Sequence, residues 1–176
     1  GAESALIAVD NNADYPEAAA NFPTKVDAYE PNVESIIALS PDLVIVASDI
    51  GGLVDALDRA SVPVLFIDLD TDVKTIDAVF GQIGLMGRIT EREQEALDLI
   101  AGLTARVKAV EAKLTGLPNT RGPRLYHELD STFYSVSDST FIGNLYKTLK
   151  ARNIAGDGGG VAYPQLTQEK IIADDP

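Results

Sequence analysis

The chain has 176 residues, of which 45% are hydrophobic, and this composition indicates a globular protein with a sizeable apolar core rather than a disordered one. Lys and Arg number 14 against 27 Asp and Glu, so the formal charge of −13 would repel a nucleic-acid backbone and argues against nucleic acid as a partner. With no Cys and one His, disulfides, thiolate chemistry and His-cluster metal sites are excluded, any metal would need oxygen ligands, and we predict neither a metal site nor a cofactor.

Strands and helices alternate in the first part of the chain. The apolar run over residues 6–9 predicts a short buried strand, which a polar loop and a short helix over 17–21 follow. Asn32 is a good N-cap, and the apolar stripe after it predicts a helix that Pro41 ends. A polar loop directly after a strand is where α/β proteins place their sites.

A strand, a helix and a second strand follow as one compact unit. Residues 43–48 and 62–68 predict continuous apolar strands, and a helix from Leu53 to about Ala60 comes between them after the loop 49–52. Because neither strand alternates apolar and polar residues, we predict a parallel sheet that is covered on both faces.

Two long helices are predicted next. The first covers about 73–87, and the second, which we expect Thr90 to cap, covers about 91–114. About 24 residues at 1.5 Å each give the second helix a length of roughly 36 Å, which exceeds the thickness of a small sheet domain. We therefore predict that this helix joins two lobes.

A second α/β unit is predicted to begin after the long helix. Residues 124–129 and 133–136 are strand-like, and 140–150 is helical. A glycine-rich loop over 153–160 precedes a further helix that Thr167 caps. These elements predict an N-terminal α/β lobe over residues 1–90, a lobe-connecting helix over 91–116 and a partial C-terminal α/β lobe over 117–176.

An eight-residue pattern occurs twice. Residues 34–41 and 169–176 share Glu-x-Ile-Ile-Ala-x-x-Pro, and the two copies begin with Glu34 and Glu169. A predicted strand follows the first copy, whereas the second copy ends the sequence. Two copies on either side of a long helix predict two related halves, of which the second is truncated before its sheet is complete. A match of this length can also arise by chance in helices rich in Ala and Ile.

A series of short motifs runs through the whole chain. The motifs are Asp14-Tyr15-Pro16, Tyr29-Glu30-Pro31-Asn32-Val33-Glu34, Pro41-Asp42-Leu43-Val44-Ile45, Ser48-Asp49-Ile50-Gly51-Gly52, Phe141-Ile142-Gly143-Asn144-Leu145, Arg152-Asn153-Ile154 and Tyr163-Pro164-Gln165-Leu166. In this order they resemble the solute-binding proteins of metal-chelate ABC importers, the class that carries cobalamin, ferric siderophores and haem. The resemblance implies an α/β, two-lobed periplasmic-binding-protein fold, with parallel-sheet lobes that a long helix joins. Members begin with a further strand and helix before Gly1 and continue past Pro176, so we expect a truncated second lobe.

Glu34 and Glu169 gain a role from this resemblance. In the family, one Glu at the tip of each lobe docks onto Arg residues of the membrane permease, and these two positions match it. A carboxylate and a guanidinium form a charge-assisted pair that can be bidentate, so two such pairs would fix the protein's orientation on its permease. Alternatively, both glutamates simply lie in first turns of helices, where a negative charge favours the helix dipole.

Polar and aromatic residues after the strands are the candidate ligand contacts, because α/β sheets bind ligands at the carboxyl ends of their strands and the ligand would lie between the lobes. The candidates from the first lobe are Asn11, Asn12, Tyr15, Tyr29, Ser48, Asp49 and Ile50, and those from the second are His127, Glu128, Asp130 and Tyr163. In the family an aromatic residue near position 29 often stacks on the ligand, which Tyr29 suits. Each candidate has a simpler alternative, since Asn and Asp also form turns and a Tyr can lie at a rim.

The single His of the chain, His127, is predicted to lie in a strand, where it shares a face with Leu129. A lone His suggests axial ligation of a haem or corrinoid metal, but we favour a hydrogen-bonded cleft or structural His. His127 is therefore counted among the ligand contacts and not as a metal ligand.

The predicted ligand loops contain no Lys or Arg, which anionic ferric siderophores usually require, and their polar residues suit a bulky neutral or cationic chelate. We therefore expect a protein that captures cobalamin or another corrinoid and delivers it to an ABC permease. A ferric-siderophore or haem binder and a non-transport sensor are the alternatives. An enzyme is disfavoured, because the loop 48–52 lacks the pattern of phosphate-binding loops and Asp49 would repel a phosphate. We predict no catalytic residue, since a separate subunit hydrolyses ATP in such importers.

The sequence also bears on location and assembly. No apolar run approaches the roughly 18 residues of a membrane-spanning helix. The absence of Cys fits an exported protein, although many cytosolic proteins also lack Cys, and the resemblance implies a periplasmic protein or a cell-surface lipoprotein. An unpaired edge of the truncated lobe would allow two copies to associate.

Overall fold

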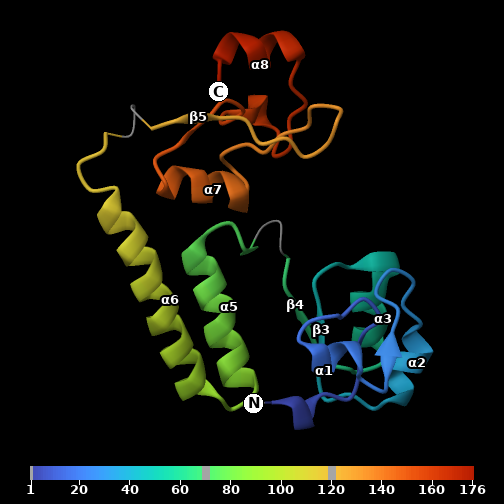
Figure 1. Ribbon diagram of the computed structural model, residues 1–176. Coiled ribbons are helices and arrows are strands. Elements are labelled where there is room, and N and C mark those ends of the chain that lie inside the picture. Colours follow the sequence, from blue (N-terminus) through green and yellow to red (C-terminus); the bar gives the residue numbers. More distant parts are fainter. Residues whose placement is uncertain (1, 69–71, 119–121) are drawn as a thin grey trace. The chain divides into compact units, whose positions relative to one another are not determined.

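The structure of the chain is a computed structural model that describes residues 2–68, 72–118 and 122–176 (Figure 1). It divides into two compact units, Gly1–Leu69 and Asp70–Pro176. Both units combine helices with parallel strand pairs, so the predicted α/β class is confirmed. The division into lobes over 1–90 and 117–176 with a connecting helix over 91–116 stays a prediction.

The first unit contains two parallel strand pairs. Its strands are β1 (Val9–Asp10), β2 (Lys25–Val26), β3 (Val44–Val46) and β4 (Val64–Phe66), its helices are α1 (Glu17–Ala20), α2 (Val33–Ala38) and α3 (Leu53–Arg59), and its 3-10 turns are η1 (Glu3–Ala5) and η2 (Ile50–Gly52). β1 pairs with β2 and β3 with β4. The predicted βαβ unit is therefore confirmed, with α3 as the crossover helix between β3 and β4.

Helices α2 and α3 pack on one face of the β3–β4 pair. The core of this unit is built from Ile36, Leu53 and Leu57, which are buried against valines of the strands. Val44 and Val46 point to this core, whereas Ile45 between them points to the other face and is 50% exposed. Among the described residues of the first unit, helices cover only one face of this pair, so the predicted covering of both faces is not found within that unit.

The strand predicted over 6–9 is wrong except at Val9. Leu6 and Ile7 are 50% and 46% exposed, and β1 begins only where Lys25 and Val26 supply a parallel partner. An apolar run favours burial, but the position of the neighbouring strand decides where pairing begins. The partner strand β2 was not predicted, since it is only two residues long and one of them is a lysine.

The second unit begins with two long helices, α5 (Ile76–Ile89) and α6 (Glu93–Lys113), which lie side by side (Figure 1). A Cβ added at Gly87 would lie 2.5 Å from the Cβ of Ala96, so the glycine permits the close approach of the two helices. With 21 residues, α6 is about 32 Å long. Within the described ranges, no helix is both long and apolar enough to cross a lipid bilayer.

Thr90 follows α5 and does not cap α6. Its hydroxyl donates to the Met86 carbonyl oxygen at 2.8 Å, and α6 begins after Arg92. The predicted cap is therefore wrong, because a Thr between two helices can bond back to the first as well as forward to the second. At the start of α5, by contrast, the Thr75 hydroxyl accepts the Ala78 N–H at 3.1 Å.

The remaining part of the second unit surrounds a buried segment. Its elements are β5 (Arg124–Leu125), α7 (Phe141–Thr148), β6 (Arg152–Asn153), η3 (Gly158–Gly160) and α8 (Gln168–Asp174), and β5 pairs with β6 in parallel. Of the strand predicted over 133–136, only Tyr134 forms a bridge, to Gln165, although Ser135 and Val136 are fully buried. The Lys150 ammonium donates to the carbonyl oxygens of Leu114 (3.0 Å) and Leu117 (2.6 Å), which ties the end of α6 to the residues after α7.

Candidate functional site

Residues that follow β1 and β2 meet at one edge, as parallel pairing requires. The Asn11 side chain donates to the Asp27 carboxylate at 3.2 Å, and Asn12 donates to the Asn11 side-chain oxygen at 2.8 Å. The backbone N–H of Asn12 also donates to the Asp10 carboxylate. The structure thus brings Asn11 and Asn12 together. Both side chains are hydrogen-bonded to each other, and Asn11 is also bonded to Asp27 after β2.

Asp27 organises the turn that carries Tyr29. Its Oδ1 atom accepts the backbone N–H groups of Tyr29 (2.8 Å) and Glu30 (3.0 Å). The hydrogen bonds from Glu30 and Tyr29, with a smaller contribution from Asn11, hold the pKa of Asp27 below its ordinary value. Sequence reasoning missed Asp27. The signal that could have found it is its residue type, since an Asp side chain often accepts the backbone N–H two residues further on and forms an Asx turn.

Tyr29 and Ile50 line the same pocket of the first unit. This pocket has a volume of about 310 Å³, and its lining residues are Tyr29, Glu30, Pro31, Val33, Ile50, Gly51 and Leu53. Tyr29 is 71% exposed, so most of its side chain is open to a ligand. The structure therefore brings two of the predicted ligand residues together beside an apolar wall.

The other predicted residues of this unit lie outside the pocket lining. The Asp49 carboxylate accepts the Val54 N–H at 2.9 Å and so supports the start of α3. Ser48 is exposed and Tyr15 is 89% exposed. As ligand contacts, these three residues stay predictions.

His127 lies two residues beyond the end of β5, so the prediction that it shares a strand face with Leu129 is wrong. Its Nδ1 atom is hydrogen-bonded to the Tyr146 hydroxyl at 2.6 Å, with ring centroids 5.9 Å apart. The hydrogen-bonded His is thus confirmed, and its bond to Tyr146 occupies one ring nitrogen. Glu128 is exposed and Tyr163 is 48% exposed, and both stay predicted ligand contacts.

A tight turn follows His127. The Asp130 carboxylate accepts the Thr132 hydroxyl at 2.5 Å and the Thr132 N–H at 2.8 Å, and these bonds lower the pKa of Asp130. Burial, and secondarily the charges of Glu128 and Asp130, raise the pKa of Tyr126. The predicted candidate Asp130 is thus bound within its own turn.

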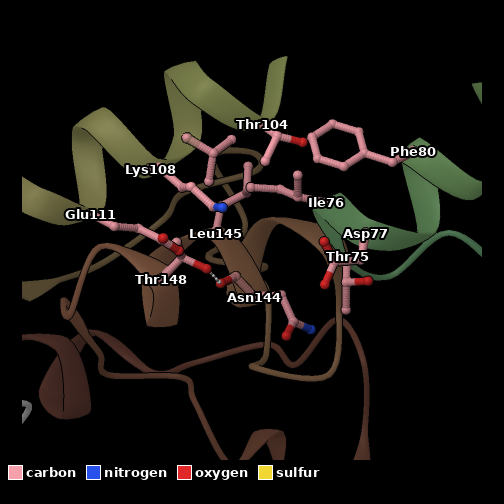
Figure 2. A pocket seen from close by; sticks show the side chains of 11 residues that line it. Thr75, Ile76, Asp77, Phe80, Thr104, Lys108, Glu111, Asn144, Leu145 and Thr148 are labelled. Carbon is pink, nitrogen blue, oxygen red and sulfur yellow. Dashed lines mark hydrogen bonds between the residues drawn. The ribbon is translucent and has the colours of Figure 1, made fainter. Parts of the chain in front are cut away.

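A larger pocket of about 410 Å³ lies among α5, α6 and α7 (Figure 2). Its lining combines apolar side chains such as Phe80 and Leu145 with the charged groups of Asp77, Lys108 and Glu111. None of the predicted ligand residues lines it. The larger hollow and the predicted site are therefore different places.

Glu34 and Glu169 occupy the same position in their helices. Each is the second residue after an N-cap whose side chain accepts an N–H from the third, Asn32 from Ser35 at 2.7 Å and Thr167 from Lys170 at 3.2 Å. Both glutamates are exposed, and no hydrogen bond or ion pair joins either carboxylate to another described residue. The repeated pattern thus extends from sequence to local structure.

The described ranges contain no group of three or more His, Cys, Asp or Glu residues that could hold a metal ion.

The features described so far are those of an α/β solute-binding protein. They are parallel strand pairs with a crossover helix, a pocket with an exposed tyrosine, and a repeated helix start. The family described as "Periplasmic binding protein" matches residues 1–176, and the chain belongs to this family. The predicted resemblance is therefore confirmed.

Relatives and a solved structure agree with this assignment. The chain is 31% identical to a cobalamin-binding protein of Halobacterium salinarum over 82% of this chain and 38% of the relative, and 27% identical to a vitamin B12-binding protein of Vibrio vulnificus over 97% and 61%. It superposes on 65% of a possible iron-binding periplasmic solute-binding protein of Staphylococcus epidermidis, with a TM-score of 0.78 and 22% identity over 96% of this chain. This likeness confirms the periplasmic-binding-protein fold. The chain spans less than two thirds of each of these proteins.

Proposed function

We propose that this chain acts as an extracytoplasmic solute-binding protein that captures cobalamin or another corrinoid and delivers it to the permease of an ABC importer. Membership of the periplasmic binding protein family supports the class and the location. The names of the Halobacterium and Vibrio relatives support the ligand. In this proposal the chain itself carries no catalytic residue.

The observation that carries the delivery role is the equivalence of Glu34 and Glu169. The two carboxylates stand at matched helix positions in two copies of one sequence pattern, and both are exposed. A role in the helix dipole alone would explain their place in the first turn but not their equivalence in the two copies. One anchor in each half supports docking onto paired Arg residues of a permease.

The charge of the first unit supports a neutral or cationic chelate. Residues 1–69 carry twelve Asp or Glu and two Lys or Arg, a net charge of −10, whereas residues 70–176 carry fifteen and twelve, a net charge of −3. An anionic ferric siderophore would be repelled by such a surface. The Tyr29 ring, with an apolar face and a polar edge, suits the broad face of a corrin ring.

Titration calorimetry of the full-length protein tests this proposal. We expect saturable one-to-one binding of cyanocobalamin, and about tenfold weaker binding for Tyr29→Ala, because the substitution removes a stacking surface. Tyr29→Phe is the matched control, since it keeps the ring and should keep the affinity within about twofold.

Two further chelates separate the alternatives. If haemin or a ferric hydroxamate bound and cyanocobalamin did not, the ligand would be a haem or a ferric siderophore and not a corrinoid. Binding of none of the three would contradict the capture role and favour a sensor. Association of two copies through the edge of the truncated second lobe stays a prediction, which sedimentation of the 176-residue chain checks.

A further inference from the structure

The turn that presents Tyr29 is held by one carboxylate. Oδ1 of Asp27 accepts two successive backbone N–H groups, those of Tyr29 and Glu30, at 2.8 and 3.0 Å. Oδ2 of the same group accepts the Asn11 side chain at 3.2 Å. Asp27 therefore fixes the backbone of the turn and links it to the residue that follows β1.

The position of the Tyr29 ring depends on this backbone. Tyr29 is 71% exposed, and its side chain forms no hydrogen bond or ring contact with the described residues. An exposed aromatic side chain that must be ordered on binding loses affinity, and a backbone that is ordered in advance reduces that cost. The hydrogen bonds of Asp27 supply such order before a ligand arrives.

The part of the 310 Å³ pocket lining that Ile50 and Gly51 form is held in a similar way. Ile50 and Gly51 belong to the turn before α3, and the Asp49 carboxylate accepts the Val54 N–H at 2.9 Å across that turn. Each of these two parts of the lining thus has an aspartate beside it that bonds to the backbone and is itself absent from the pocket lining. The aspartates shape the pocket, while the lining side chains remain free to contact a ligand.

We propose that Asp27 is a positioning residue of the chelate site, which acts through Tyr29 by fixing the turn 27–30. The inference rests on the proposed function, since it needs Tyr29 to contact the chelate. The Asp27 carboxylate is ionised at neutral pH like any ordinary Asp, and the hydrogen bonds from Glu30 and Tyr29 hold its pKa below the ordinary value, because an ionised acceptor forms the stronger bonds.

Substitutions of Asp27 test the inference with cyanocobalamin as the probe. We expect Asp27→Ala to weaken binding by about threefold to tenfold, because the turn is no longer ordered in advance. Asp27→Asn should lose less, within about threefold of the wild type, since its amide oxygen can accept the same two N–H groups although its amide nitrogen, a donor, no longer accepts the Asn11 side chain. Asp58→Ala is the charge control, because Asp58 is exposed and its side chain bonds to no described residue.

A double substitution shows whether Asp27 acts through the ring. In a Tyr29→Ala background, Asp27→Ala should cause no further loss of affinity. An equal loss in both backgrounds would mean that Asp27 contacts the chelate directly and would overturn the positioning role. If Asp27→Asn and Asp27→Ala weakened binding equally, the charge of Asp27, and not its hydrogen bonds to the turn, would explain the loss of affinity.

Amide hydrogen exchange gives a readout without ligand. The amides of Tyr29 and Glu30 should exchange at least about tenfold faster in Asp27→Ala and near the wild-type rate in Asp27→Asn. Unchanged exchange in Asp27→Ala would overturn the positioning role by itself. A wild-type protein that binds none of the three chelates would instead overturn the proposed function, so the two failures are distinguishable.

Discussion

In the first unit the Asp27 carboxylate accepts the backbone N–H groups of Tyr29 and Glu30 and leaves the Tyr29 side chain 71% exposed, whereas in the second unit the candidate His127 is itself hydrogen-bonded to the Tyr146 side chain. A side chain that holds the backbone leaves its neighbours open to a ligand. A side chain that bonds to another side chain has already used part of its own hydrogen-bonding capacity. The comparison indicates that the first unit presents the more open recognition surface.

The largest expected effect concerns the small core of the first unit. Leu57→Ala should lower the free energy of unfolding by about 2–5 kcal/mol, because Leu57 is fully buried and its removal leaves a cavity. Leu97→Ala in α6 is the control, since Leu97 is 58% exposed and should cost less than about 1 kcal/mol. Urea denaturation of both variants measures the difference, and equal losses would mean that the core assignment is wrong.

The second effect concerns the feature that the two units share. Glu34→Ala and Glu169→Ala should each reduce uptake of radiolabelled cyanocobalamin by about tenfold or more in vesicles that contain the permease and its ATPase, because each removes one charge-assisted anchor. The affinity for the free chelate should not change. Glu17→Ala is the control, an exposed glutamate in the first turn of α1. Full uptake by either variant would contradict docking by that glutamate and would leave only its favourable interaction with the helix dipole.

The smallest effect concerns the turn of the second unit. Thr132→Val removes the hydroxyl that lowers the pKa of Asp130 most, so this pKa should rise towards its ordinary value, while Thr132→Ser should keep it low. A depressed pKa in the folded state means that the turn's contribution to stability is present above the ordinary Asp value and is lost as the pH falls through the lowered value. Carboxyl carbon NMR titration measures the shift, and an unchanged midpoint in Thr132→Val would contradict the assigned cause.

Local signals in the sequence predicted the elements that local chemistry stabilises. The apolar stripes after Asn32 and Thr167 predict both residues as caps, and the apolar strands predict the βαβ unit, as the structure shows them. Strands β2 and β6 were not predicted, because two residues carry no periodicity and their pairing depends on a distant partner. Thr90 failed as a cap because two adjacent helices compete for one hydroxyl.

The candidate site was predictable to a similar extent. Tyr29, in the loop before the predicted cap Asn32, and Ile50, after a predicted strand, both match family motifs, and the structure places both at one pocket. Asp27 was missed because Asp forms turns at many positions, and residue type does not show which of these turns carries a site residue such as Tyr29. The bond between His127 and Tyr146 joins residues 19 positions apart, a distance that no local pattern covers.

The contact between Gly87 and Ala96 in the α5–α6 hairpin has an evolutionary consequence. A Cβ at Gly87 would lie only 2.5 Å from the Cβ of Ala96, so neither position can gain a larger side chain unless the two helices separate. The two positions are therefore coupled, and they already hold the two smallest residue types. Substitution at an exposed position of the hairpin, such as Leu97, meets no such restriction.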